Sequence, residues 1–302
     1  MNQALIVNLA GLRLEHPVMN ASGILGSEPE HLEVLAGYGF SVLVSKTITL
    51  EPREGYPPPI TVELRNKGLL NAVGLANPGV QAVRPLAEKA RELGKPLILS
   101  IGGSSPREFS KLVEAASEAR VNAIELNLSC PHVRGHGLEL GSDPSLVYEI
   151  VKNSSSITSI PVIAKLGLSD RVVESAGRAL EAGARALTLI NTIKAMAIDV
   201  YVMKPILSNK HGGLSGPPIH PIAVRVVYDV YKEYKPEIIG AGGVSTWIDA
   251  AELILAGAKA IQVGTALLYN SRIVAELKDG LLKWIKSLGY SRLEELVGRA
   301  VD

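Results

Sequence analysis

Polar side chains recur in this sequence where short apolar runs end. The set comprises Asn20, Ser22, Lys46, Asn127, Ser129, Cys130, Lys165, Asn191 and Thr192. Each type alone has an ordinary structural use, since Asn and Ser satisfy backbone groups, Lys extends along the surface and Cys packs as a small apolar residue. It is harder to explain by structure alone why so many apolar runs end in polar residues. If the runs are the strands of one barrel, these side chains converge on one pocket.

Glycines end the last two apolar runs. Gly242 and Gly243 follow one run, and Gly264 with Thr265 follows the other. Glycine lets backbone N–H groups approach an anion closely, although tight turns alone also use it. In a barrel of parallel strands the last two strand-to-helix loops are the usual phosphate site. We therefore predict phosphate binding at these glycines.

The elements that would position these residues alternate along the chain. Near-continuous apolar runs predict eight buried strands, at residues 17–22, 41–46, 96–101, 123–129, 161–166, 186–191, 237–240 and 260–264. Helical patterns fall between them, at residues 81–93, 106–119, 144–151, 171–182, 219–231, 246–255 and 272–288. A closed barrel and an open doubly wound sheet both fit this alternation. The count of eight, without GxGxxG after the first strand, favours an α/β fold of the (β/α)8 TIM-barrel type, with residues 1–302 as a single domain.

Three further features surround the predicted barrel. Residues 4–8 and 12–14 are spaced like a small hairpin, which we place across the bottom of the barrel. Long connections follow strands two and six, at residues 47–79 and 192–218, and long loops on the C-terminal face of a barrel usually carry function. Ser105, Asp170 and Ser245 precede helical patterns and are candidate N-caps.

Composition narrows the class of protein. The chain has 302 residues, 47% of them apolar, a formal net charge of +1 and one cysteine. It is therefore globular, and its charge suggests no nucleic-acid or anionic membrane partner. One cysteine excludes an internal disulfide framework and an iron–sulfur cluster held by this chain's cysteines alone. The N-terminal residues lack the features of a signal peptide, no segment reads as membrane-spanning, and no metal site is predicted, so we expect a cytoplasmic protein without a membrane anchor.

Nine motifs together resemble those of class 1 dihydroorotate dehydrogenases. They are NASG (20–23), SKT (45–47), LNAVGLANPG (70–79), ELNLSCP (125–131), VIAKLG (162–167), INT (190–192), GGLSGPPIHPIAVRVV (212–227), GAGGV (240–244) and VGTA (263–266). The resemblance covers residues 17–270. It is greatest to the type that works with a separate electron-transfer subunit. The membrane-docked class has an N-terminal extension and a serine base, and the sequence has neither.

The resemblance implies a flavoprotein of pyrimidine biosynthesis that oxidises dihydroorotate to orotate with FMN. It assigns the proton at substrate C5 to Cys130 as the base, and the hydride at C6 to flavin N5, with Lys165 near the flavin N1/O2 edge. It implies orotate contacts from Lys46, Asn71, Gly74, Leu75, Asn127, Asn191 and Thr192. It implies FMN contacts from Ala21, Ser22, Gly23, Lys46, Thr47, Asn127, Lys165, Ile190, Gly216, Gly242, Gly243, Gly264 and Thr265.

These assignments also make chemical sense. An amide-rich ring needs paired donors and acceptors, which the three asparagines and Thr192 supply, and a carboxylate needs a cation such as Lys46. A fixed ammonium at Lys165 would stabilise negative charge as it develops on a reduced flavin. The Cys130 thiol must lose its proton before it can act as a base.

The sequence departs from the family pattern at two positions. His132 stands where Asn usually follows the Cys-Pro pair, and this resembles the flavin domain of dihydropyrimidine dehydrogenase. Ser100 ends strand three, where close relatives have Asn near the flavin, so a smaller side chain or a water would do that work.

Several alternatives stay open at this stage. One is a dihydropyrimidine dehydrogenase-like enzyme that acts on uracil or thymine. Another is a flavin-free, phosphate-binding aldolase or lyase in which Lys165 forms a Schiff base. A non-catalytic barrel is the third. The electron acceptor is also open: electrons leave either to a small acceptor or through a separate subunit with FAD, an iron–sulfur cluster or both. We expect a homodimer.

Overall fold

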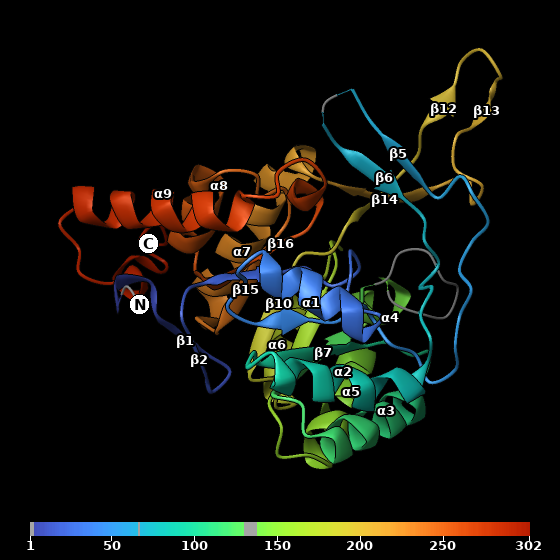
Figure 1. Ribbon diagram of the computed structural model, residues 1–302, viewed down its shortest axis with the longest axis horizontal. Helices are drawn as coiled ribbons and strands as arrows, with labels where there is room; N and C mark the ends of the chain where they lie inside the picture. The colour runs from blue at the N-terminus through green and yellow to red at the C-terminus, as the bar shows by residue number, and fades with distance from the viewer. Residues whose placement is uncertain (1–2, 66, 130–137) are drawn as a thin grey trace.

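The computed structural model describes residues 3–65, 67–129 and 138–302 (Figure 1). Its central sheet has eight parallel strands in the order β3-β16-β15-β10-β9-β8-β7-β4. Their bounds are β3 Val18–Asn20, β4 Leu43–Val44, β7 Leu97–Ile101, β8 Ala123–Asn127, β9 Val162–Leu166, β10 Ala186–Leu189, β15 Ile238–Ala241 and β16 Ala258–Val263. All eight predicted strands are confirmed, with ends that differ by a few residues.

The sheet closes into a barrel between β3 and β4. The Asn20 side chain accepts a hydrogen bond from Val44 N (2.9 Å) and donates one to Val44 O (2.7 Å). Ser41 N donates to Val18 O at 3.2 Å. Asn20, one of the polar residues at strand ends, therefore joins the first barrel strand to the second and lies outside the candidate site.

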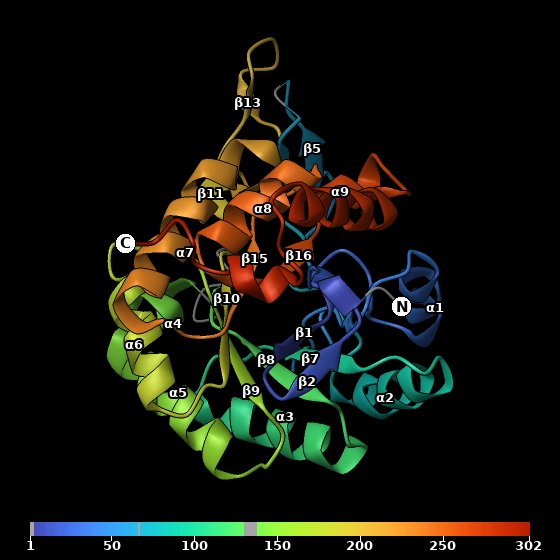
Figure 2. The same ribbon diagram turned by 90° about the vertical axis from the view of Figure 1, so that its left-hand side faces the viewer.

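Helices surround the barrel (Figure 2). They are α1 Pro29–Gly37, α2 Val83–Glu92, α3 Pro106–Ala119, α4 Leu138–Ser142, α5 Pro144–Ser156, α6 Val172–Glu181, α7 His220–Tyr234, α8 Trp247–Leu255 and α9 Ile273–Ser287. The seven predicted helices are present, whereas α1 and α4 were not predicted. Because the helices cover the strands, every residue of β7, β8 and β9 is buried.

The predicted helix caps have mixed outcomes. Ser105 caps α3 by accepting a hydrogen bond from Glu108 N, as predicted. The prediction for Asp170 is wrong, since α6 begins one residue later, with Arg171 at the N-cap and no capping hydrogen bond from its side chain. The prediction for Ser245 is also wrong by one residue, because Thr246 caps α8 in a capping box with Asp249.

The N-terminal hairpin lies at the bottom of the barrel, as predicted. Its strands are β1 Val7–Leu9 and β2 Leu12–Leu14. The turn residue Ala10 donates its N–H to the carboxylate of Glu237, which directly precedes β15. The hairpin thus contacts the N-terminal ends of the parallel strands, opposite the end where their polar residues gather.

The two long connections pair with each other above the C-terminal ends of the barrel strands. Their strands β11 Ile193–Ala195, β14 Gly212–Ser215, β6 Leu69–Asn71 and β5 Thr61–Glu63 form an antiparallel sheet in that order, here called the upper sheet. Strands β12 Ile198–Asp199 and β13 Lys204–Pro205 extend beyond it as a protruding hairpin (Figure 1). The upper sheet was not predicted, and it fixes both connections over the barrel.

Candidate active site

A cavity of about 740 Å³ lies at the C-terminal ends of the barrel strands, beneath the upper sheet. Its volume is in the range of small-molecule and cofactor sites. It brings together all the described residues that the resemblance assigned to the substrate or FMN, namely Ala21, Ser22, Gly23, Lys46, Thr47, Asn71, Gly74, Leu75, Asn127, Lys165, Ile190, Asn191, Thr192, Gly216, Gly242, Gly243, Gly264 and Thr265. Of the other polar residues at strand ends, Asn20 and Ser129 do not line it. Cys130 and His132 lie outside the described residues.

A buried charged network forms the floor of the cavity. The Lys165 ammonium on β9 lies 3.6 Å from Glu125 Oε1 on β8 and 3.4 Å from Gln262 Oε1 on β16. Gln262 Nε2 donates to Glu125 Oε2 at 2.9 Å, and Thr188 Oγ1 donates to the same oxygen at 3.0 Å. Glu125 is fully buried, and a buried carboxylate requires such partners. Lys165 is thereby held at a fixed place in the cavity floor.

A chain of hydroxyl and amide groups forms the side wall. Asn127 Nδ2 donates to Thr47 Oγ1 at 2.9 Å, and Asn127 Oδ1 accepts from Ser129 N at 3.2 Å and from Ser129 Oγ at 3.1 Å. Asn191 Nδ2 donates to Ser129 Oγ at 3.0 Å. Ser129, the residue before Cys130, therefore orients both asparagines. Asn191 Nδ2 also donates to Ser129 O at 3.2 Å, and Asn191 Oδ1 accepts from Thr192 N at 2.8 Å. The second Nδ2 hydrogen of Asn127 and the second lone pair of Asn191 Oδ1 therefore remain to pair with a planar amide ring in the cavity.

Lys46 follows β4 and differs from Lys165 in its surroundings. Burial lowers the pKa of the Lys46 ammonium below its ordinary value. No carboxylate pairs with it among the residues that the structure describes. An ammonium that has lost water without gaining a counter-charge favours an anionic ligand, and a carboxylate is the simplest one.

The glycine end of the cavity is built for close backbone approach. Gly216, Gly242 and Gly243 have φ angles of 87°, 128° and 73°, which side chains rarely adopt. A Cβ on Gly243 would lie 2.8 Å from Gly216 O, so these turns pack directly on each other. Gly264 is different, because its φ is −118° and a Cβ there would make only ordinary van der Waals contacts, with Ala21 at 3.4 Å and Ile24 at 3.8 Å. The steric need for glycine is thus strong at the first three positions and weak at Gly264.

Ser100 does not line the cavity. It is fully buried in β7, where its hydroxyl lies 3.2 Å from Thr47 Oγ1 and donates to Glu125 Oε1 at 3.1 Å. Ser100 therefore links the floor network to the side wall from below. Its small side chain suits this place.

Sequence reasoning missed Glu125 and Gln262 as parts of the site. A signal was present, because Glu125 and Asn127 stand two residues apart in an apolar strand and so share a face. Gln262 likewise interrupts the apolar run of β16. A polar residue inside a strand buried on both faces needs a partner within the barrel, and these two residues pair with each other.

Within the described part of the chain, no helix is both long and apolar enough to cross a bilayer.

Comparisons with known proteins agree with the fold and the cavity. A provisionally named dihydroorotate dehydrogenase A (fumarate) of Aeropyrum pernix is 50% identical over 98% of this chain and 97% of its own. The dihydroorotate dehydrogenase B (NAD(+)) catalytic subunit of Pyrococcus abyssi is 45% identical over 98% of both chains. The crystal structure of dihydroorotate dehydrogenase from Eimeria tenella, in complex with ferulenol, superposes with a TM-score of 0.84 at 25% identity, over 98% of this chain and 88% of that one. The family model for dihydroorotate dehydrogenase matches residues 4–285, and the chain belongs to that family.

Proposed function

We propose that this protein oxidises dihydroorotate to orotate with FMN as its bound cofactor. The observation that carries the proposal is the make-up of one cavity. It joins a glycine-lined anion cradle to a pocket with three asparagines and the Lys46 ammonium, which has no carboxylate partner among the described residues, and the paired Lys165 ammonium lies in its floor. A flavin mononucleotide has a phosphate for the first part, and dihydroorotate has a carboxylate and two amide groups for the second.

The described residues fit FMN. Gly216, Gly242 and Gly243 would hold its phosphate, together with the backbone at Gly264 and the hydroxyl of Thr265. The ring would lie against residues at the C-terminal ends of β3, β4, β8 and β10, which are Ala21, Ser22, Gly23, Lys46, Thr47, Asn127 and Ile190. When bound, FMN supplies the site for the hydride that leaves C6 of the substrate. The Lys165 ammonium would hold the negative charge of the reduced ring at its N1/O2 edge.

The remaining lining residues suit the substrate. Lys46 would bind its carboxylate, while Asn71, Asn127 and Asn191 would bind its ring amides. Gly74, Leu75 and Thr192 complete this end of the cavity. Loss of the C6 hydride and the C5 proton together creates the C5–C6 double bond. We assign the proton to Cys130, which directly follows the wall residue Ser129 in the sequence.

The proposal extends to where the protein works and with what. The two relatives differ in the electron acceptor that their names give, fumarate in one and NAD⁺ in the other. We propose a separate electron-transfer subunit carrying FAD, an iron–sulfur cluster or both, because the name of the Pyrococcus relative describes a catalytic subunit. We also propose that residues 1–302 form one catalytic domain in the cytoplasm.

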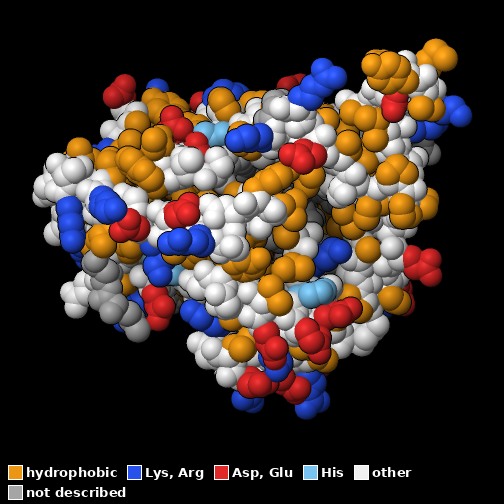
Figure 3. All heavy atoms as spheres, turned by 45° about the horizontal axis from the view of Figure 1, so that its top comes forward, with side chains coloured by type: hydrophobic (Ala, Val, Ile, Leu, Met, Phe, Trp, Pro, Cys, Tyr) orange, Lys and Arg blue, Asp and Glu red, His pale blue; other side chains and the backbone are white. Residues whose placement is uncertain are grey.

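A homodimer is part of the same proposal. The protruding hairpin exposes Val200, Tyr201 and Met203 to 74, 92 and 81%. Figure 3 shows hydrophobic side chains gathered on this projecting end of the molecule. Large apolar side chains so exposed are typical of an interaction surface. Light scattering on the purified chain tests the dimer. If the hairpin forms the interface, Tyr201→Ser should weaken it.

Two competing functions make different predictions. A dihydropyrimidine dehydrogenase-like enzyme would act on dihydrouracil, which has no carboxylate and would leave Lys46 unpaired. An aldolase using Lys165 would need a lysine free to attack a carbonyl, whereas this one is held against Glu125.

The test begins with the colour of the purified protein. We expect about one FMN per chain, released on denaturation, and anaerobic bleaching of its absorbance by dihydroorotate but not by dihydrouracil. Protein that stays colourless after incubation with FMN would overturn the proposal. Equal bleaching by both compounds would favour the dihydropyrimidine reading.

A further inference from the structure

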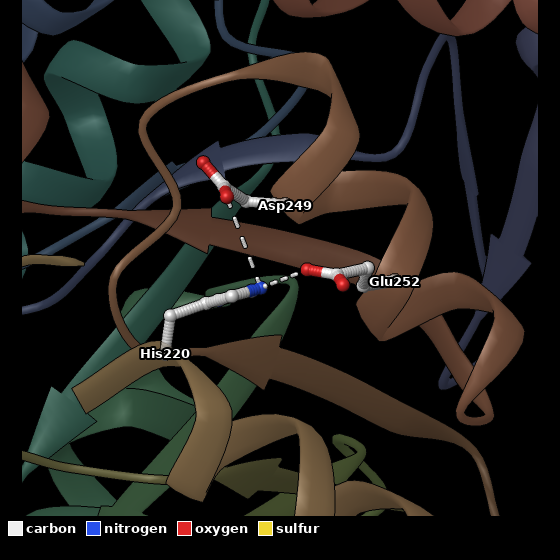
Figure 4. Close-up of side chains that lie close together, drawn as sticks. All are labelled: His220, Asp249 and Glu252. Atoms are coloured by element: carbon white, nitrogen blue, oxygen red, sulfur yellow. Dashed lines mark hydrogen bonds and ion pairs between the residues drawn. The ribbon is translucent and has the colours of Figure 1, made fainter. Parts of the chain in front are cut away.

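A histidine lies directly behind the glycine cradle, outside the cavity. His220 is the first residue of α7 and is buried. Its Nδ1 lies 2.9 Å from the carbonyl oxygen of Gly242, and its Nε2 lies 2.9 Å from Glu252 Oε2 and 4.0 Å from Asp249 Oδ1 (Figure 4). Both carboxylates come from α8. The ring thus joins the cradle to two helices.

Both ring nitrogens face atoms that only accept hydrogen bonds. A carbonyl oxygen has no hydrogen to give, and neither has an ionised carboxylate. A neutral imidazole has one N–H, so it would direct a lone pair at one of these oxygens. The imidazolium satisfies both contacts at once. The described charged groups that face the ring are Asp249 and Glu252, and both stabilise its positive charge.

A metal ion fits the three side chains less well than a proton. Zinc ligands about 2.0–2.1 Å from a tetrahedral ion stand roughly 3.4 Å apart. His220 Nε2 and Glu252 Oε2 are 2.9 Å apart, which is a hydrogen-bond distance. Asp249 Oδ2 is already used, because it accepts hydrogen bonds from Ser245 and Thr246. The N-terminus of α7 disfavours a cation, but two carboxylates outweigh one helix end.

The contact with Gly242 orients the cradle. In a planar trans peptide the carbonyl oxygen of one residue and the N–H of the next point in opposite directions. Holding Gly242 O against the His220 ring therefore turns the Gly243 N–H away from the ring. Gly243 N has no hydrogen-bond acceptor among the described residues, and both glycines line the cavity. This N–H is available to an anion there.

We propose that His220, as an imidazolium held by Glu252 and Asp249, is a positioning residue of the cradle that selects a phosphate monoester. It fixes the Gly242–Gly243 peptide and places a positive charge behind the bound phosphate. This proposal rests on the proposed FMN site. It adds that His220 strengthens the binding of the FMN phosphate group at the cradle. Riboflavin, which is FMN without the phosphate, is the matched probe.

The test compares FMN and riboflavin binding to the apoprotein by fluorescence quenching, at pH 7.5 to 9.5, where a phosphate monoester stays doubly ionised because its second pKa is about 6. We expect His220→Leu to weaken FMN binding about tenfold to a hundredfold, as for loss of one charge-assisted hydrogen bond, and to leave riboflavin unchanged. His220→Asn keeps a donor without the charge and should lie between. His31→Leu, a histidine of α1 outside the cavity lining, is the control.

Two further readouts separate positioning from folding. In wild type, FMN affinity should fall relative to riboflavin affinity as pH rises, whereas in His220→Leu the ratio should stay flat. Nitrogen NMR of labelled histidine should show both His220 ring nitrogens protonated at pH 7. Equal loss of both ligands in His220→Leu, or a flat wild-type ratio, would overturn the proposal. So would stoichiometric zinc binding that His220→Leu abolishes. Failure of wild type to bind either flavin would instead refute the FMN site itself.

Discussion

The pairing of Lys165 with Glu125 predicts that one lysine has two separable effects. Replacing Lys165 with Met removes the ammonium and keeps most of the apolar stem. The variant loses an ion pair at 3.6 Å and leaves a fully buried carboxylate without a cation. At an effective dielectric constant of about 20, that pair is worth about 4.6 kcal/mol before desolvation is counted.

The expected loss of stability is smaller than this Coulomb energy. Breaking a buried ion pair from one side costs about 3–5 kcal/mol. Ser100, Thr188 and Gln262 still donate hydrogen bonds to Glu125, so we expect Lys165→Met to lower the free energy of unfolding by about 3 kcal/mol. Adding Glu125→Gln to Lys165→Met replaces the buried, uncompensated carboxylate with a neutral amide. The double variant should therefore regain at least half of the lost stability, as measured by denaturant unfolding of the apoprotein.

Catalysis should not recover with stability. If Lys165 holds charge on the reduced flavin, Lys165→Met should slow anaerobic flavin reduction about a hundredfold, or about 3 kcal/mol. The double variant should remain as slow, because the ammonium is still missing. Lys152→Met, at an exposed site on α5, should change neither quantity. Flavin reduction at the wild-type rate in Lys165→Met, or recovery of that rate in the double variant, would refute the reasoning.

Three other predictions concern single residues. Lys46→Met should weaken orotate binding about tenfold to a hundredfold in titrations. The same change should stabilise the apoprotein to thermal unfolding, because burial lowers the pKa of the Lys46 ammonium and a buried cation of this kind opposes folding. Burial lowers the pKa of His16 to about 4, so the native state binds fewer protons than the unfolded state below about pH 6.5. The free energy of unfolding should therefore be highest above about pH 6.5 and fall by up to about 3 kcal/mol towards pH 4. His16→Gln should flatten this pH dependence in urea unfolding. Cys130→Ala should keep FMN and orotate binding while slowing flavin reduction about 10²–10⁴-fold in stopped-flow experiments, and Cys130→Ser should shift the rise of the rate to higher pH; an unchanged rate would move the proton to another group.

The sequence predicted the barrel because each strand carries its own signal. A run such as β8 is mostly apolar, ends in polar residues and is followed by a helix, and all of this is local. The same holds for α3, whose serine cap and first-turn proline define its start. The candidate site followed from the barrel, since the ends of parallel strands meet at one face whatever the loops do.

The upper sheet was missed because its signal is not local. Strand β6 pairs with β14, so that Asn71 lies opposite Gly213, more than a hundred residues away. Each strand has only three or four residues and lies in a segment rich in Gly and Pro, which reads as a loop. Such pairing depends on the barrel first bringing the two connections together. The hydrogen bond from Asn71 Nδ2 to Gly213 O, at 3.1 Å, then joins a cavity-lining residue to the opposite connection.

The two lysines that line the cavity, Lys165 and Lys46, differ in whether a described carboxylate lies beside the ammonium group. Lys165 has its counter-charge built into the barrel, so its ammonium stays in place whether or not a ligand is bound. Such a charge suits a cofactor whose own charge changes during turnover, because nothing must rearrange when negative charge develops. Lys46 has burial without a described counter-charge, so its ammonium gains most when an anion arrives. That suits a ligand that must bind and leave in every cycle. In the proposed function, the distribution of carboxylates around the two ammonium groups would therefore separate the cofactor end from the substrate end.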